Sequence, residues 1–95
     1  MESVKIPAED SIDLHTFRPE DISDLLSEYF LECMANGIYT VRIIHGKGKG
    51  ILKNSVAGIL NKSPYVISFF DSPPERGGWG STIAELTRNN KLKEK

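Results

Sequence analysis

The chain has 95 residues, of which 39% are hydrophobic and 26% are charged, and its formal net charge is -1 at pH 7. This length suits one domain of ordinary globular composition, and the near-zero charge argues against a protein that coats nucleic acid by bulk electrostatic attraction. No apolar run approaches the ~20 residues that span a bilayer, no signal-peptide pattern opens the chain, and a single cysteine, Cys33, cannot form an internal disulfide. We therefore expect a cytoplasmic protein with no membrane partner.

The first half of the sequence predicts an arm, a strand and a helix. Residues 1–10 form the arm, and SIDLH at 11–15 alternates apolar and polar residues as a short strand does. A helix is predicted to begin at Pro19 and to end at Asn36-Gly37. Its apolar residues recur at spacings of three and four and predict one buried stripe: Ile22, Leu25, Leu26, Tyr29, Phe30, Cys33 and Met34.

The second half predicts three more strands and one more helix. The strands are expected at 39–44, 65–70 and 81–86, and the helix follows a glycine-rich loop, with Leu52, Val56, Ile59 and Leu60 at helical spacing. The domain would then span 11–87, followed by a basic flexible tail at 88–95. The order βαβαββ predicts a two-layer α/β sandwich with a mixed four-stranded sheet, and both helices cover one face if the two crossovers step the same way.

Two histidines are predicted to meet at one edge of this sheet. His15 ends the first strand and His45 ends the second, and parallel strands bring their carboxyl ends to one edge, where ligands bind in α/β folds. Asp13 shares a strand face with His15 and could orient its ring. Such a pair could serve as general acid or base in phosphodiester cleavage, or could simply hydrogen-bond a phosphate or its own partner.

The stretch RIIHGKGKGILK at 42–53 predicts a phosphate-binding loop. Its glycines let backbone N–H groups approach a ligand, the next helix begins at once, and lysines add positive charge. The spacing matches neither a nucleotide P-loop nor the dinucleotide GxGxxG pattern, and the alternative is a merely flexible turn. The predicted contacts are Gly46, Lys47, Gly48, Lys49, Gly50 and Lys53.

Charge distribution supports an anionic partner on one side of the fold. Nine of the 13 acidic residues precede residue 33, and residues 33–70 contain none. Arg18 and Arg42 are candidate phosphate contacts, although Arg42 has the parity of Thr40 and Ile44 and could lie on the open sheet face instead. GGWGST at 77–82 adds a flexible backbone and an aromatic ring that could stack on a base or form a hydrophobic lid; its candidate residues are Gly77, Gly78, Trp79, Gly80 and Thr82.

No dedicated metal site is predicted. Asp13, His15, His45 and Asp71 have no recognised ligand spacing, so no cofactor is firmly expected, and a loosely held divalent ion is left open.

Three ordered motifs resemble the Smr (small MutS-related) domain, in its stand-alone bacterial form. IDLH at 12–15 is similar to the family's LDxH motif, HGKG at 45–48 to its HGxG motif, and GGWGST at 77–82 to its GGxGxT motif. Two departures are Ile12, which replaces the commoner Leu, and Thr16, where many members have Gly.

The resemblance implies a βαβαββ fold and nucleic-acid binding, with nicking or endonuclease activity on DNA or RNA in some members. It also implies roles in DNA repair and recombination, since members fused to mismatch-repair-like ATPases suppress recombination or rescue ribosomes. It implies that the Asp-x-His and HGxG motifs act in cleavage or binding. We therefore expect an endonuclease, a phosphodiester hydrolase with Asp13, His15 and His45 as catalytic residues. The alternative is a non-catalytic module that binds branched DNA or structured RNA through the HGKG loop. A small-molecule phosphate binder or a protein-interaction domain is the third hypothesis.

Overall fold

A four-stranded sheet and two α-helices make up the computed structural model, which describes residues 9–46, 50–76 and 78–88. Every predicted strand and helix is present. The bounds are β1 (Glu9–Asp13), α1 (Ile22–Ala35), β2 (Thr40–Ile44), α2 (Ile51–Lys62), β3 (Val66–Asp71) and β4 (Ser81–Leu86). Short 3-10 helices precede α1 and β4: η1 (Pro19–Asp21), η2 (Pro74–Arg76) and η3 (Gly78–Gly80).

Strand β1 lies two residues earlier than predicted, at 9–13 instead of 11–15. The reason is local, because the backbone N–H of His15 donates to the Asp13 carboxylate at 3.0 Å. An aspartate that accepts from the amide two residues on forms an Asx turn, which competes with the sheet ladder. His15 therefore follows the strand instead of closing it.

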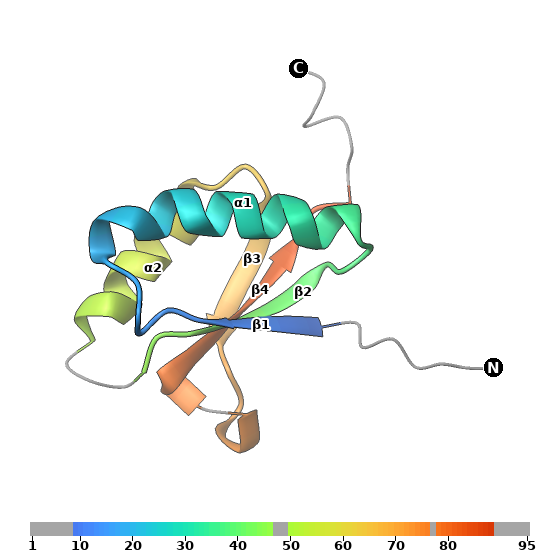
Figure 1. Ribbon diagram of the computed structural model, residues 1–95. Coiled ribbons are helices and arrows are strands. Elements are labelled where there is room, and N and C mark those ends of the chain that lie inside the picture. Colours follow the sequence, from blue (N-terminus) through green and yellow to red (C-terminus); the bar gives the residue numbers. More distant parts are fainter. Residues whose placement is uncertain (1–8, 47–49, 77, 89–95) are drawn as a thin grey trace.

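The sheet has the strand order β1-β2-β4-β3. Strands β1 and β2 are parallel, and β4 is antiparallel to both of its neighbours. The crossover through α2 thus passes over β4, which fills the gap between β2 and β3. Figure 1 shows α1 and α2 on one side of the sheet, in the predicted two-layer arrangement, and the 72–80 segment on the side away from α1.

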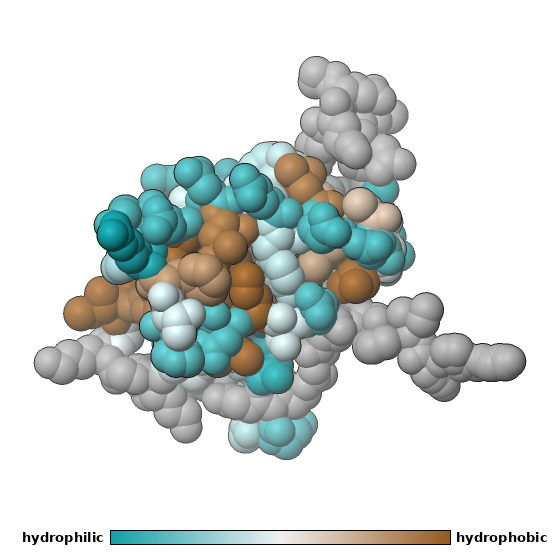
Figure 2. Space-filling model, in the orientation of Figure 1, coloured by the Kyte–Doolittle hydropathy of each residue, from teal (hydrophilic) through white to brown (hydrophobic). Residues whose placement is uncertain are grey.

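The core lies between the sheet and the two helices. The predicted stripe of α1 is confirmed, because Ile22, Leu26, Phe30 and Cys33 are buried and its other members pack against them. Each large apolar side chain buried in this way stabilises the fold by ~1.5–3 kcal/mol. Figure 2 shows hydrophobic residues in the seam between α1 and α2 and hydrophilic residues along the outer surface of α1. None of the helices in the described residues is long and apolar enough to cross a membrane.

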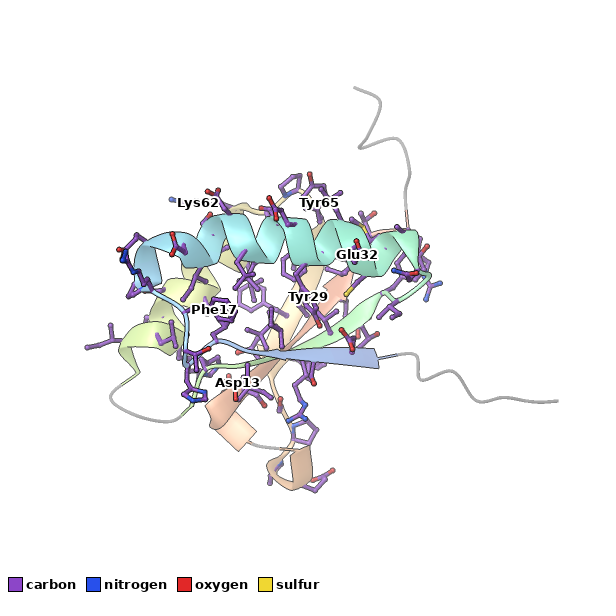
Figure 3. All side chains as sticks on the ribbon, in the orientation of Figure 1. Asp13, Phe17, Tyr29, Glu32, Lys62 and Tyr65 are labelled. Carbon is purple, nitrogen blue, oxygen red and sulfur yellow. The ribbon has the colours of Figure 1, made fainter. Side chains whose placement is uncertain are left out.

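A polar contact joins α1 to the first strand. The Tyr29 hydroxyl donates to the Asp10 carboxylate at 2.9 Å, and Figure 3 shows Tyr29 on α1 above β1. Burial, together with this hydrogen bond, raises the pKa of Tyr29, and burial also raises the pKa of Cys33. A thiol that resists ionisation is a poor nucleophile, so Cys33 is a core residue as its place in the stripe predicted.

Gly50 gives a direct test of how the loop before α2 is built. This residue caps α2 with φ of +83°, a conformation that costs an L-residue ~1–2 kcal/mol. We expect Gly50→Ala to lower the free energy of unfolding by about that amount, measured by urea denaturation. Gly58 is the matched control, because it lies inside α2 with nothing within 4 Å of an added Cβ. Gly58→Ala should raise stability by ~0.5–1 kcal/mol, and equal effects of the two variants would contradict the assignment.

Candidate functional site

The carboxyl ends of β1 and β2 lie side by side. Asp13 is the register partner of Ile44, and the N–H of Leu14 donates to the Ile44 carbonyl at 2.9 Å. His15 and His45 follow these positions, so the chain segments that carry them leave the sheet at one edge, as predicted. The two rings nevertheless have different surroundings.

His15 and Asp13 form an exposed pair. The ring Nδ1 lies 2.8 Å from Asp13 Oδ1, and the two side chains are 70% and 50% exposed. A carboxylate only accepts, so Nδ1 carries the proton and donates it. Nε2 makes no hydrogen bond to any residue in the described ranges. Figure 3 shows Asp13 near the end of β1, on the side of the sheet away from α1. The carboxylate thus fixes the ring and leaves Nε2 for a ligand.

The same contacts change the acidity of Asp13. The hydrogen bond from the His15 ring lowers the pKa of Asp13 most, and the bond from the His15 backbone lowers it further. Both bonds favour the ionised carboxylate. Asp13 therefore keeps its negative charge in more acidic solution than an ordinary aspartate does.

His45 is buried, with only 6% of its surface exposed. Its Nδ1 lies 3.0 Å from the Gly46 carbonyl, and its Nε2 lies 2.8 Å from the Thr82 hydroxyl. A carbonyl only accepts, so Nδ1 donates, and in the neutral ring Nε2 accepts from Thr82. Both nitrogens are used within the protein, and the ring joins the end of β2 to β4.

The ends of the predicted phosphate loop are held by the backbone. The N–H groups of His45 and Gly46 both donate to the Gly80 carbonyl, at 3.1 and 2.8 Å. Gly46 and Gly50 both have positive φ, of +82° and +83°, so glycine is required where the loop begins and where it meets α2. The predicted contacts Lys47, Gly48 and Lys49 lie outside the described residues.

Lys53 contacts the end of strand β3. Its Nζ lies 3.0 Å and 3.2 Å from the two carboxylate oxygens of Asp71. This ion pair joins the first turn of α2 to the sheet, close in the chain to Gly50.

The two arginine candidates differ in position. Arg18 is 73% exposed and contacts Glu20 at 3.4 Å, which makes it available at the surface before α1. Arg42 is half-buried and alternates with the buried Val41 and Ile43. It therefore lies on the sheet face away from the helices, the second of the two positions that the sequence allowed.

The glycine-rich segment and the first residues of β4 hydrogen-bond to the start of the loop that follows β2. The Gly80 carbonyl and the Thr82 hydroxyl hold His45 and Gly46, and Gly78 has φ of +55°. Gly77 and the side chain of Trp79 lie outside the described part of the structure, so the predicted stacking of this ring stays a prediction.

Two serines at this edge were not singled out from the sequence. Ser72 and Ser81 are buried, their hydroxyl oxygens lie 2.6 Å apart, and the Ser72 N–H donates to the Ser81 carbonyl at 3.1 Å. They close the loop between β3 and β4. Lone serines carry no motif, and only the pairing of these two strands could have drawn attention to them.

Possible metal ligands at this edge can be compared only within the described residues. Asp13 and His15 offer two ligand atoms, but no group of three or more His, Cys, Asp or Glu residues within 9–46, 50–76 and 78–88 could hold a metal ion. Sites that bind a metal firmly use more protein ligands than this pair supplies.

Fold and site define a two-layer α/β domain with an exposed Asp-x-His pair beside a loop of the His-Gly type. The family model of the Smr domain matches residues 12–87. The chain belongs to the Smr domain family.

Individual relatives agree with this assignment. The Endonuclease MutS2 of Helicobacter pylori (strain ATCC 700392 / 26695) is 40% identical over 75 residues, which cover 79% of this chain and 10% of the relative. The Smr domain of Thermus thermophilus MutS2 superposes with a TM-score of 0.77 at 32% identity and covers 82% of this chain and 98% of its own. YdaL, a stand-alone small MutS-related protein from Escherichia coli, superposes with a TM-score of 0.72 at 27% identity and covers 80% of this chain and 63% of its own. The chain spans about a tenth of the length of the curated MutS2 relative.

The Asp13–His15 pair predicts a shifted titration. Asp13 should titrate below the 3.8 of an ordinary aspartate, and His15→Ala should move the midpoint back toward that value by removing the ring donor. Because the pKa of Asp13 is depressed on folding, the stability that the pair contributes is present above the ordinary value and is lost as the pH falls through the folded pKa. Carboxyl carbon NMR measures the midpoint, and the neighbouring Thr16→Ala should leave it unchanged. A midpoint unaffected by loss of the ring would contradict the pair.

The His45–Thr82 contact predicts a loss of stability. Thr82→Val keeps the side-chain shape but leaves a buried ring nitrogen without its donor, which costs ~1–3 kcal/mol. Chemical denaturation should show that loss, whereas Thr40→Val, on the half-buried β2 strand, should change stability by less than about 0.5 kcal/mol. Equal stability of Thr82→Val and the wild type would contradict the assignment of a hydrogen bond between Thr82 and His45.

Proposed function

We propose that this Smr domain binds the sugar–phosphate backbone of DNA or RNA at the carboxyl edge of β1 and β2, and that it cleaves one strand with His15 as the proton-transferring group. The observation that carries the proposal is the exposed Asp13–His15 pair, whose Nδ1 is held by the carboxylate, at the sheet edge where the glycine loop also begins. The relatives named Endonuclease MutS2 support an endonuclease over a small-molecule phosphate binder.

The chemistry follows from the orientation of the ring. In hydrolysis, Nε2 of neutral His15 takes a proton from the attacking water, and the Asp13 carboxylate stabilises the imidazolium that forms. The oxygen that leaves the phosphorus, on the opposite side, takes a proton from water, and the imidazolium releases its proton to solvent, so the ring ends as it began. Loop amides and the predicted Lys47 would stabilise the charge that develops on the phosphoryl oxygens.

His45 takes a different role in this proposal. Its two nitrogens are already bonded to Gly46 and Thr82, so a proton transfer through this ring would break contacts that hold the loop. We therefore assign His45 as a positioning residue that shapes the loop from behind. This divides the three residues predicted as catalytic into an exposed pair that acts and a buried ring that supports.

A divalent ion would act on the same pair if it takes part. Asp13 is one of the carboxylates at this edge, and an ion bound to it would compete with the hydrogen bond to His15. The proton transfer described above uses only residues of the chain, so cleavage should persist when metal ions are removed by a chelator.

The second candidate function is a module that binds branched DNA or structured RNA without cutting it. It is favoured by the internal bonding of His45, because cleavage then depends on one exposed imidazole. Thr16 next to His15, where many family members have glycine, points the same way.

Cleavage and binding are separated by measuring both on one panel of supercoiled plasmid, branched DNA and folded RNA, with and without chelator. His15→Ala should reduce the rate of cutting by ~10²–10⁴-fold and leave binding within a few-fold of the wild type. His45→Ala should weaken both, because the loop loses its anchor to β4. Ser23→Ala is the control, because Ser23 is exposed on α1 and lies outside the three motifs.

Each outcome decides between the proposals. Cutting by His15→Ala at the wild-type rate would remove His15 from the chemistry. Binding without cutting by the wild type would leave the non-catalytic module. Affinity that does not fall with salt would contradict both, because phosphate contacts release counterions.

A further inference from the structure

We propose that Asp71 is an affinity-determining residue of the nucleic-acid site, because its carboxylate holds the Lys53 ammonium and withholds it from backbone phosphates. This inference rests on the function proposed above. It adds a residue that none of the three motifs contains, and it gives Lys53 a conditional role in place of a simple contact.

The position of Lys53 in its helix is electrostatically unfavourable. Lys53 lies in the first turn of α2, which has no acidic residue, and the amino end of a helix carries a partial positive charge. A lysine there needs a nearby negative charge. The structure supplies it from another element, because the Asp71 oxygens lie 3.0 and 3.2 Å from Nζ.

Asp71 is placed by the sheet and not by its own loop. It is the last residue of β3, and its register partner in β4 is Thr82, whose hydroxyl contacts His45 at 2.8 Å. The pairing of β3 with β4 thus places two residues side by side. Thr82 holds His45 at the start of the loop, and Asp71 holds Lys53 just after the end of the loop. The ion pair is therefore part of the same edge as the proposed binding site.

Exposure indicates which partner can be replaced. The Asp71 side chain is 55% exposed and the Lys53 side chain is 26% exposed, so the carboxylate faces solvent where an anion would approach. The ammonium is mostly covered and is bonded to that carboxylate, so a phosphate that approaches this edge meets the negative charge of Asp71 first. With Asp71 present, the Lys53–Asp71 pair has almost no net charge. Lys53 therefore neutralises no phosphate and displaces no counterion from the nucleic acid.

Salt dependence tests this role, since the logarithm of the binding constant falls with the logarithm of salt concentration by ~0.9 for each duplex phosphate neutralised. The probe is a fluorescein-labelled DNA duplex, and binding to the full chain is followed by fluorescence anisotropy over a series of salt concentrations. Asp71→Asn should bind ~3–10-fold more tightly at low salt and steepen the slope by about 0.9. The double variant Lys53→Gln with Asp71→Asn should return the slope to the wild-type value, because the steepening needs the ammonium.

Lys62→Gln is the matched control. Lys62 is the last residue of α2, and Figure 3 shows it on the outer side of the helical layer, away from Asp13. Its loss should leave the slope of both the wild type and Asp71→Asn unchanged. Circular dichroism on each variant establishes that the fold is retained.

The outcomes separate this inference from the function it rests on. Binding by the wild type with a slope unchanged in Asp71→Asn, or weaker binding by that variant, overturns the role of Asp71 and leaves the proposed function intact. A steeper slope that persists in the double variant also overturns it, because the effect would then be general repulsion by the carboxylate. Absence of salt-dependent binding in wild type and Asp71→Asn alike would overturn the proposed function itself.

Discussion

Strand β4 pairs with β2 on one side and with β3 on the other, so the first residues of β4 contact the ends of both strands. This places Gly80 and Thr82 against His45 and brings Asp71 to the same edge. Strand β4 can lie between β2 and β3 because the crossover through α2 leaves room for one strand there. Without it, the loop after β2 would lack the hydrogen bonds at its entrance, and Lys53 would lack its carboxylate.

The two histidines at this edge differ in what their ring nitrogens contact. The buried ring has both nitrogens bonded to protein atoms, whereas the exposed ring has one nitrogen held by a carboxylate and one directed to solvent. Burial makes the first contact strong and specific, because an unpaired polar atom in the interior is costly. Exposure makes the second ring available to a ligand and lets it exchange protons with water. His15 lies two residues beyond the end of β1, whereas His45 directly follows β2, so the Asx turn at Asp13 sets the exposed ring one position further from its strand.

Most of the fold could be predicted from periodicity. The stripe from Ile22 to Met34 and the β-branched run before His45 are strong signals, and both elements lie within a few residues of their predicted ends. The end of β1 could not be placed, because the Asx turn at Asp13 outweighs the alternation of SIDLH. The strand order also could not be read, since no local signal says that β4 lies between β2 and β3.

Motif spacing placed three of the predicted site residues at one edge of the sheet, but it did not predict the contacts that each of them makes. Motif spacing found Asp13, His15 and His45, yet the difference in their burial arises from the sheet order. The Lys53–Asp71 pair joins residues 18 positions apart, and the Ser72–Ser81 pair joins the two ends of a loop. Neither contact produces a periodic pattern or a motif within one stretch of sequence. Contacts of this kind follow only once the pairing of the strands is known.

The Asx turn at Asp13 has a consequence for how this site can change. One carboxylate both ends the strand and steers the imidazole, so the shape of the chain and the chemistry of the ring are specified by a single side chain. An asparagine would keep the turn while losing the charge, and a longer glutamate would keep the charge while misplacing the turn. Neither substitution at position 13 therefore keeps both functions of the side chain. A change in the position of the imidazole would require a change in the turn as well.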